Sequence, residues 1–132
     1  MSEESYLPEE FNHVLQRFEQ MMRDNASYYF DREELEDLIY YYSDQFLFSK
    51  ALLVVEHAKN LFPQNAALQI REAEIYTSMG QLHKALGILK KTSPFEEEQL
   101  DWLMANAVAY SQLHEHDKAI GFLEQAIQTA DV

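Results

Sequence analysis

A short motif recurs in this chain at a constant interval, and this limits what the chain can fold into. The letters KAL stand at residues 50–52 and 84–86, and KAI stands at 118–120, an interval of 34 residues each time. Aligning residues 32–65, 66–99 and 100–132 gives a shared column of tyrosines, Tyr42, Tyr76 and Tyr110, and a shared column of lysines, Lys50, Lys84 and Lys118. Because several columns agree at one period, the chain is predicted to contain three copies of one structural unit.

Each copy is predicted to fold as two helices. Apolar residues recur at helical spacing, and only three glycines and three prolines interrupt the chain. The break between the two helices falls at SDQFLFS, SMGQLHK and LHEHDK, where Gly80 suits the left-handed end of a helix. A helical hairpin buries its apolar face only when another hairpin stacks on it, so the expected fold class is all-α, an α-α superhelix (solenoid) of three hairpins.

A capping helix is expected before the repeats. The apolar residues between Phe11 and Met22 follow helical spacing and predict an amphipathic helix over roughly 8–24. Asp31 is expected to cap the next helix, with Glu34 completing a capping box. The predicted domains are therefore a capping helix and connector over 1–31 and repeats over 32–65, 66–99 and 100–132.

The last predicted helix carries more apolar residues than one covering face needs. Repeat arrays end in elements with one polar face, because the last hairpin has no neighbour. We therefore expect either that these residues are an N-terminal part of a longer repeat protein, or that the open C-terminal end self-associates with another chain.

The repeat resembles a known family. A 34-residue helix-turn-helix unit with a tyrosine late in its first helix, an alanine early in its second and a proline near its end resembles the tetratricopeptide repeat. These features fall on Tyr42, Ala51 and Pro63 in the first copy, with Tyr76 and Ala85 in the second. The family's tryptophan is missing from its column, although Trp102 is immediately adjacent. The resemblance covers about three-quarters of the chain.

Two local expectations accompany this resemblance. Small side chains let paired helices approach closely, so Ala73 is expected to meet Ala85, and Ala107 is expected to meet Ala119. Ser93-Pro94 followed by Glu96 reads as a helix cap, a first helical residue and a capping box. The second helix of the second copy should therefore be short and the first helix of the third copy unusually long.

The resemblance also implies a binding surface. In tetratricopeptide repeats, the first helices of the hairpins line a concave groove that usually receives a peptide or a helix of another protein. Carried across by column, the partner-binding residues are Glu33, Glu36, Asp37, Tyr40 and Asp44 in the first copy, Ile70, Arg71 and Glu74 in the second, and Asp101, Met104 and Val108 in the third. The residues along such a groove change from acidic and aromatic in the first copy to apolar in the third.

These residues favour one class of ligand. Family members that hold the acidic C-termini of heat-shock chaperones share a clamp of lysines, asparagines and an arginine, whereas Glu36, Tyr40 and Ile70 stand at those columns here. We therefore expect a ligand with basic residues and an apolar segment, such as an amphipathic helix. The alternative is that the protein's own next segment covers Ile70, Met104 and Val108.

Charge excludes other partners. The net charge is −13, from 23 acidic and 10 basic residues, which disfavours nucleic acid and anionic membranes because both are bound chiefly by basic side chains. The alternative explanation for the charge is a solvated surface that keeps the protein soluble. The chain has no cysteine, begins with acidic residues unlike a signal peptide, and contains no stretch of eighteen apolar residues, so a cytoplasmic protein is expected.

Catalytic motifs are missing from the sequence. His114 and His116 alternate with Glu115 and Asp117, but two nearby histidines without a third positioned ligand are better explained as a polar turn. There is no phosphate-binding glycine loop, no HExxH and no nucleophile elbow. We therefore expect no catalytic residue, metal or cofactor, and a non-catalytic scaffold that binds another protein. The alternative is a structural or self-associating segment of a larger solenoid whose ligand site lies elsewhere.

Overall fold

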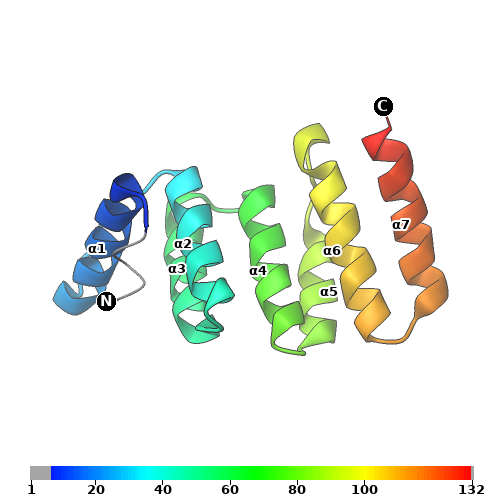
Figure 1. Cartoon of the computed structure of the whole chain (residues 1–132), viewed down its shortest axis with the longest axis horizontal. Coiled ribbons are helices and arrows are strands. Elements are labelled where there is room, and N and C mark those ends of the chain that lie inside the picture. Colours follow the sequence, from blue (N-terminus) through cyan, green and yellow to red (C-terminus); the bar gives the residue numbers. More distant parts are fainter. Residues whose placement is uncertain (1–6, 132) are drawn as a thin grey trace. The chain divides into compact units, whose positions relative to one another are not determined.

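The computed structural model describes residues 7–131 (Figure 1). These residues form helices and no strand: α1 (Glu9–Asp24), α2 (Arg32–Asp44), α3 (Phe48–Leu61), α4 (Ala66–Ser78), α5 (Leu82–Lys91), the 3-10 helix η2 (Glu96–Glu98), α6 (Gln99–Gln112) and α7 (His116–Ala130). The all-α class is confirmed. Residues 1–6 and 132, at the ends of the first and last predicted domains, lie outside the described residues. Among the described helices, none has both the length and the apolar character needed to cross a membrane.

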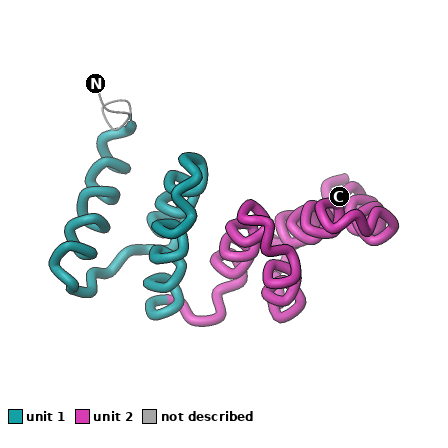
Figure 2. Tube along the Cα trace, turned by 90° about the horizontal axis from the view of Figure 1, so that it is seen from below, with its two compact units in different colours: residues 1–61 teal, residues 62–132 magenta. Residues whose placement is uncertain are grey.

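Two compact units make up the chain, residues 1–61 with α1 to α3 and residues 62–132 with α4 to α7 (Figure 2). Within the units, helices consecutive in sequence pack in pairs: α2 with α3, α4 with α5, and α6 with α7. The first helices of the pairs end at Asp44, Ser78 and Gln112, and the second helices begin at Phe48, Leu82 and His116. Both sets of helix ends repeat every 34 residues, as the sequence motif does.

A left-handed residue follows the first helix of every pair. Phe46, Gly80 and His114 have φ angles of 61°, 79° and 62°. Their amides donate to the carbonyl oxygens of the residues three positions earlier, each at 3.0 Å. In each turn, the following amide donates to the carbonyl oxygen of the column tyrosine at 2.9 to 3.0 Å. These bonds satisfy carbonyl groups at the helix end, so the expectation for Gly80 is confirmed and the other two copies build the same turn without glycine.

In the first unit, the connector fixes α1 to the helix pair. Asp31 forms the predicted capping box, since its Oδ1 accepts from the Glu34 amide at 2.8 Å and its amide donates to Glu34 Oε1 at 3.0 Å. The buried Phe18 ring of α1 lies 5.9 Å from the ring of Phe30 and 6.2 Å from that of Tyr42. These contacts pack α1 against the connector and the first helix pair.

In the second unit, small and aromatic side chains share one apolar core. Ala73 and Ala85 are both fully buried in it, together with residues of α6 and α7. The indole Nε1 of Trp102 donates to the Leu89 carbonyl oxygen at 2.9 Å, and the Trp102 ring lies edge-on to Phe122 at 5.9 Å. Trp102 therefore joins three helices of this unit, α5, α6 and α7.

The start of α6 differs from the prediction. Helix α5 is short, with 10 residues, as expected. Helix α6, however, begins at Gln99 and has 14 residues, only one more than α4, so the expected long helix is wrong. The backbone of Phe95 is extended, with φ −75° and ψ 173°, and only the single turn η2 precedes α6. Because an extended residue interrupts the helix, Ser93 cannot cap α6.

Candidate protein-interaction surfaces

Helix α2 exposes an acidic row with one aromatic residue. Glu33, Asp37, Tyr40 and Asp44 are all exposed, and their spacing places them on one face of the helix. The opposite face buries Leu35, Leu38 and Ile39 in the core of the first unit. Four of the predicted partner-binding residues are therefore accessible in this unit.

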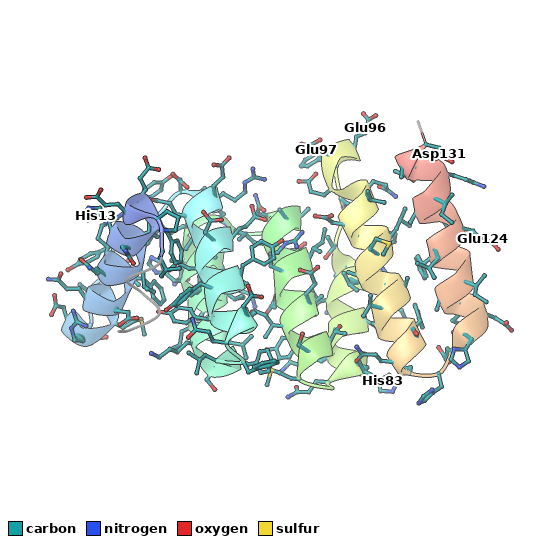
Figure 3. The ribbon with its side chains drawn as sticks, in the orientation of Figure 1. His13, His83, Glu96, Glu97, Glu124 and Asp131 are labelled. Carbon is teal, nitrogen blue, oxygen red and sulfur yellow. The ribbon has the colours of Figure 1, made fainter. Side chains whose placement is uncertain are left out.

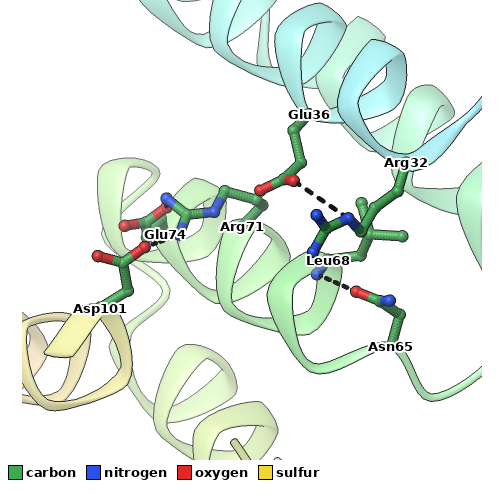
Figure 4. Close-up of polar contacts among 7 residues, drawn as sticks. All are labelled: Arg32, Glu36, Asn65, Leu68, Arg71, Glu74 and Asp101. Carbon is green, nitrogen blue, oxygen red and sulfur yellow. Dashed lines mark hydrogen bonds and ion pairs between the residues drawn. The ribbon is translucent and has the colours of Figure 1, made fainter. Parts of the chain in front are cut away.

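Glu36 is engaged within its own helix. Its Oε2 lies 3.8 Å from Arg32 Nε, and the carboxylate side chain is only 19% exposed (Figure 4). An ion pair between residues four apart on a helix reduces the charge that a ligand meets. Glu36 therefore offers less negative charge to a ligand than the sequence indicated.

A cleft of about 600 Å³ lies between α1 and the start of α2. Phe11 and Val14 give it an apolar component. Its lining carboxylates are those of Glu10, Asp31, Glu33, Glu34 and Asp37, and its other lining residues are Pro8, His13 and Arg17. Arg17 Nη1 lies 3.9 Å from Glu34 Oε2, so the negative charge of Glu34 in this cleft is partly compensated. We call this the α1–α2 cleft.

The α1–α2 cleft combines predicted and unforeseen residues. Glu33 and Asp37 were expected at a binding surface, whereas Glu10 and Phe11 were assigned only to the capping helix. The signal that could have found the cleft is the run of acids at Asp31, Glu33, Glu34 and Asp37, directly after a connector that brings α1 alongside. Acidic and apolar surfaces therefore meet within one unit.

The pKa of Asp37 is raised above its ordinary value of 3.8. The residue is exposed overall, but partial desolvation of its carboxyl group is the largest cause, followed by the negative charges of Glu33, Asp31 and Glu34. An opposite charge nearby favours the ionised form of a carboxyl group. A cationic group that enters the cleft therefore relieves an unfavourable interaction that is present in the protein alone.

On α4, two of the predicted partner-binding residues are not accessible. Ile70 is fully buried in the core of the second unit, among side chains of α5, α6 and α7, so its place on an exposed wall is wrong. Arg71 is also buried, and its Nη1 and Nη2 atoms donate to Glu74 Oε1 at 2.8 Å and to Asp101 Oδ2 at 2.6 Å (Figure 4). The expected cation of the groove is instead an ion-paired link between α4 and α6.

Helix α6 exposes apolar residues. Met104 and Val108 are 41% and 44% exposed, and Asp101 lies one turn before Met104 on the same face. In the repeat, Val108 occupies the column of Tyr40, which is 45% exposed. The columns predicted to bind a partner are thus accessible in the first helices of the first and third pairs, and largely closed in α4.

The turn between α6 and α7 carries the two histidines considered as metal ligands. Their rings contact each other edge-on at 5.9 Å, and among the described residues there is no group of three or more His, Cys, Asp or Glu that could hold a metal ion. Comparisons of the chain with protein-family models, with curated proteins and with solved structures returned no match.

Proposed function

We propose that this chain is a non-catalytic protein-interaction module built from three tetratricopeptide-like repeats. Three features of the backbone support the assignment to repeats: the first helices end, the second helices begin and the left-handed turn residues fall at intervals of 34 residues. The column tyrosines and lysines add side-chain support, since each lysine lies over the tyrosine of its own pair. Stacked helical hairpins of this kind generally present surfaces for peptides or helices.

The observation that carries the binding proposal is the α1–α2 cleft. It places Phe11 and Val14 beside the carboxylates of Glu10, Glu33 and Asp37 within one unit. A segment with lysine or arginine next to apolar residues satisfies both components, because its cations meet carboxylates while its apolar side chains leave water. The proposed ligand is therefore a basic and apolar peptide or amphipathic helix of another protein.

Peptide selection on the purified chain tests this proposal. Random sequences compete for binding to the chain, so the sequences of the selected peptides reveal the preferred ligand chemistry. A library of random displayed peptides should yield ligands in which lysine or arginine stands next to apolar residues. The decisive comparison uses the variant Glu33→Gln/Asp37→Asn and a matched control, Glu96→Gln/Glu97→Gln, which removes the same charge from exposed residues at η2 (Figure 3).

The selected peptides should bind the control as they bind the original chain, and should bind the cleft variant about tenfold more weakly, the loss expected for two charge contacts. Acidic selected peptides, or equal binding to both variants, would contradict the proposed ligand class.

A further inference from the structure

Helix α7 has two apolar faces. Ala119, Phe122 and Ala126 pack towards α6 and the core of the second unit. Ile120, Leu123 and Ile127 lie on another face and are 51%, 39% and 62% exposed. Branched apolar side chains in such a row usually mark a contact surface when they are contiguous. We call these three residues the α7 stripe.

The repeat itself indicates what kind of element covers this stripe. The columns of Ile120 and Leu123 are those of Leu86 and Leu89 in α5. Leu86 and Leu89 are only 5% and 0% exposed, because α6 packs on α5 and Trp102 bonds to the Leu89 carbonyl. Within this unit, α6 therefore covers Leu86 and Leu89 of α5. In the described part of the chain, no helix covers the corresponding residues of α7, Ile120 and Leu123.

The spacing of the stripe is that of a helix–helix seam. Ile120 and Ile127 are seven residues apart, and Leu123 and Ala130 are also seven residues apart, as in the a and d positions of a coiled coil. A facing helix with the same spacing can insert its apolar side chains between them. The stripe thus fits an amphipathic helix better than an extended peptide.

The charge along one edge of the α7 stripe indicates which kind of helix can bind there. Asp117, Glu124 and Asp131 follow each other at intervals of seven residues and are all exposed, so they form a row beside Ile120 and Ile127 (Figure 3 labels Glu124 and Asp131). Lys118, the helix's single lysine, points elsewhere: its Nζ lies 5.4 Å from the ring centroid of Tyr110 and 3.5 Å from Glu115. The exposed edge is therefore acidic along its whole length.

We propose that the α7 stripe docks an amphipathic helix of another protein, with an apolar seam and a row of lysine or arginine residues. Charge complementarity between that basic row and Asp117, Glu124 and Asp131 distinguishes this partner from a second copy of the chain. Two copies each carry a net charge of −13, and an antiparallel pairing of two α7 helices brings their acidic rows together. This site is separate from the α1–α2 cleft and does not depend on the function proposed for it.

Two synthetic helical peptides of about three heptads test the proposal. Both carry the same leucine and isoleucine seam, and the flanking positions are all lysine in one peptide and all glutamate in the other. Fluorescence anisotropy with the full chain should show about tenfold tighter binding of the lysine peptide, as expected for three exposed charge pairs. The preference should shrink in molar salt.

Variants decide whether the α7 stripe is the site. To remove any contribution of the α1–α2 cleft, these variants are made in a background that carries Glu33→Gln/Asp37→Asn. In that background, Asp117→Asn/Glu124→Gln/Asp131→Asn should abolish the preference for lysine, whereas the matched control Glu56→Gln/Glu96→Gln/Glu97→Gln, at exposed positions outside both sites, should keep it. In the same background, Ile120→Ser/Ile127→Ser should lose both peptides, with circular dichroism confirming that the helices remain. If this serine variant unfolds, the charge variants still give the answer, since their substitutions are at exposed polar positions.

Three results would overturn the proposal. One is that the lysine peptide fails to bind or binds no better than the glutamate peptide, and another is that the control loses the preference while the α7 charge variant keeps it. The third is a dimer in sedimentation equilibrium that Ile120→Ser/Ile127→Ser dissociates, because a second copy is then the occupant.

Discussion

Lys84 Nζ lies 4.6 Å from the centroid of the Tyr76 ring, so the lysine of α5 covers the tyrosine of α4. The same relationship joins Lys50 to Tyr42 at 5.6 Å and Lys118 to Tyr110 at 5.4 Å. An ammonium group over an aromatic face is attracted by the ring quadrupole. The lysine that opens each KAL or KAI motif therefore contacts the column tyrosine of its own helix pair.

Lys84→Met tests this contact, because methionine keeps most of the apolar stem and removes the charge. We expect a loss of about 0.5–1 kcal/mol in the free energy of unfolding, measured by urea denaturation. Tyr76→Leu and the double variant complete a double-mutant cycle. A coupling energy near zero would show that the proximity of the two groups does not contribute to stability.

The left-handed turn residues predict that two substitutions change the stability of the protein in opposite directions. His114 has a φ of 62°, which costs a non-glycine residue about 1–2 kcal/mol, partly offset by the greater freedom of glycine in the unfolded chain. His114→Gly should therefore stabilise the protein by about 0.5 kcal/mol. Gly80→Ala should destabilise it by about 1 kcal/mol, because an added Cβ meets nothing within 4 Å and only the φ of 79° opposes it.

Thermal unfolding of the two variants beside the original chain checks this pair. Changes of the same sign at both positions would contradict the common turn geometry.

Ala85→Leu tests the close approach of α4 and α5. Ala85 is fully buried in the core of the second unit, and three further side-chain carbons there force neighbours from their preferred rotamers. The expected cost is about 1–3 kcal/mol in urea denaturation. Ala130→Leu, at an exposed position of α7, is the matched control and should leave the midpoint nearly unchanged. An unchanged midpoint for Ala85→Leu would indicate room between the two helices.

Much of the backbone could be predicted because its determinants are local. The capping box of Asp31 and Glu34 fixes the start of α2 with two hydrogen bonds between residues three apart. Gly80 marks a helix end for a similar reason, since a positive φ favours glycine. The start of α6 could not be predicted in this way, because Ser93-Pro94 has the sequence of a helix cap and the extended Phe95 overrides it.

The candidate site depends on contacts between distant residues, and these were harder to predict. Column position alone assigned Ile70 and Arg71 to an exposed wall. Arg71 instead reaches Asp101, 30 residues away in the sequence, and Ile70 enters a core shared by four helices. The α1–α2 cleft was missed for the same reason, because it needs the placement of α1 beside α2 as well as the acids of α2.

The raised pKa of Asp37 predicts a pH-dependent effect. Desolvation and the neighbouring carboxylates favour the protonated form in the folded protein, so ionisation of Asp37 lowers stability as the pH rises above the ordinary value of 3.8. Asp37→Asn should therefore stabilise the protein at pH 7 by about 0.3 kcal/mol, the size of a relieved exposed like-charge contact. The gain should vanish below pH 3.8, where both states carry the protonated carboxyl.

Urea denaturation of both chains at pH 7 and pH 3 measures the difference. A variant that is less stable at pH 7 would contradict the unfavourable environment assigned to Asp37.

The central claim is that the α1–α2 cleft receives a basic and apolar segment of another protein. Nuclear magnetic resonance of the ¹⁵N-labelled chain, titrated with a peptide chosen by the library selection above, tests it most directly. We predict that the largest amide shifts fall on residues 8–17 and 31–37, the two segments that line the cleft. Shifts confined to α7, or no shifts at saturating peptide, would contradict the claim.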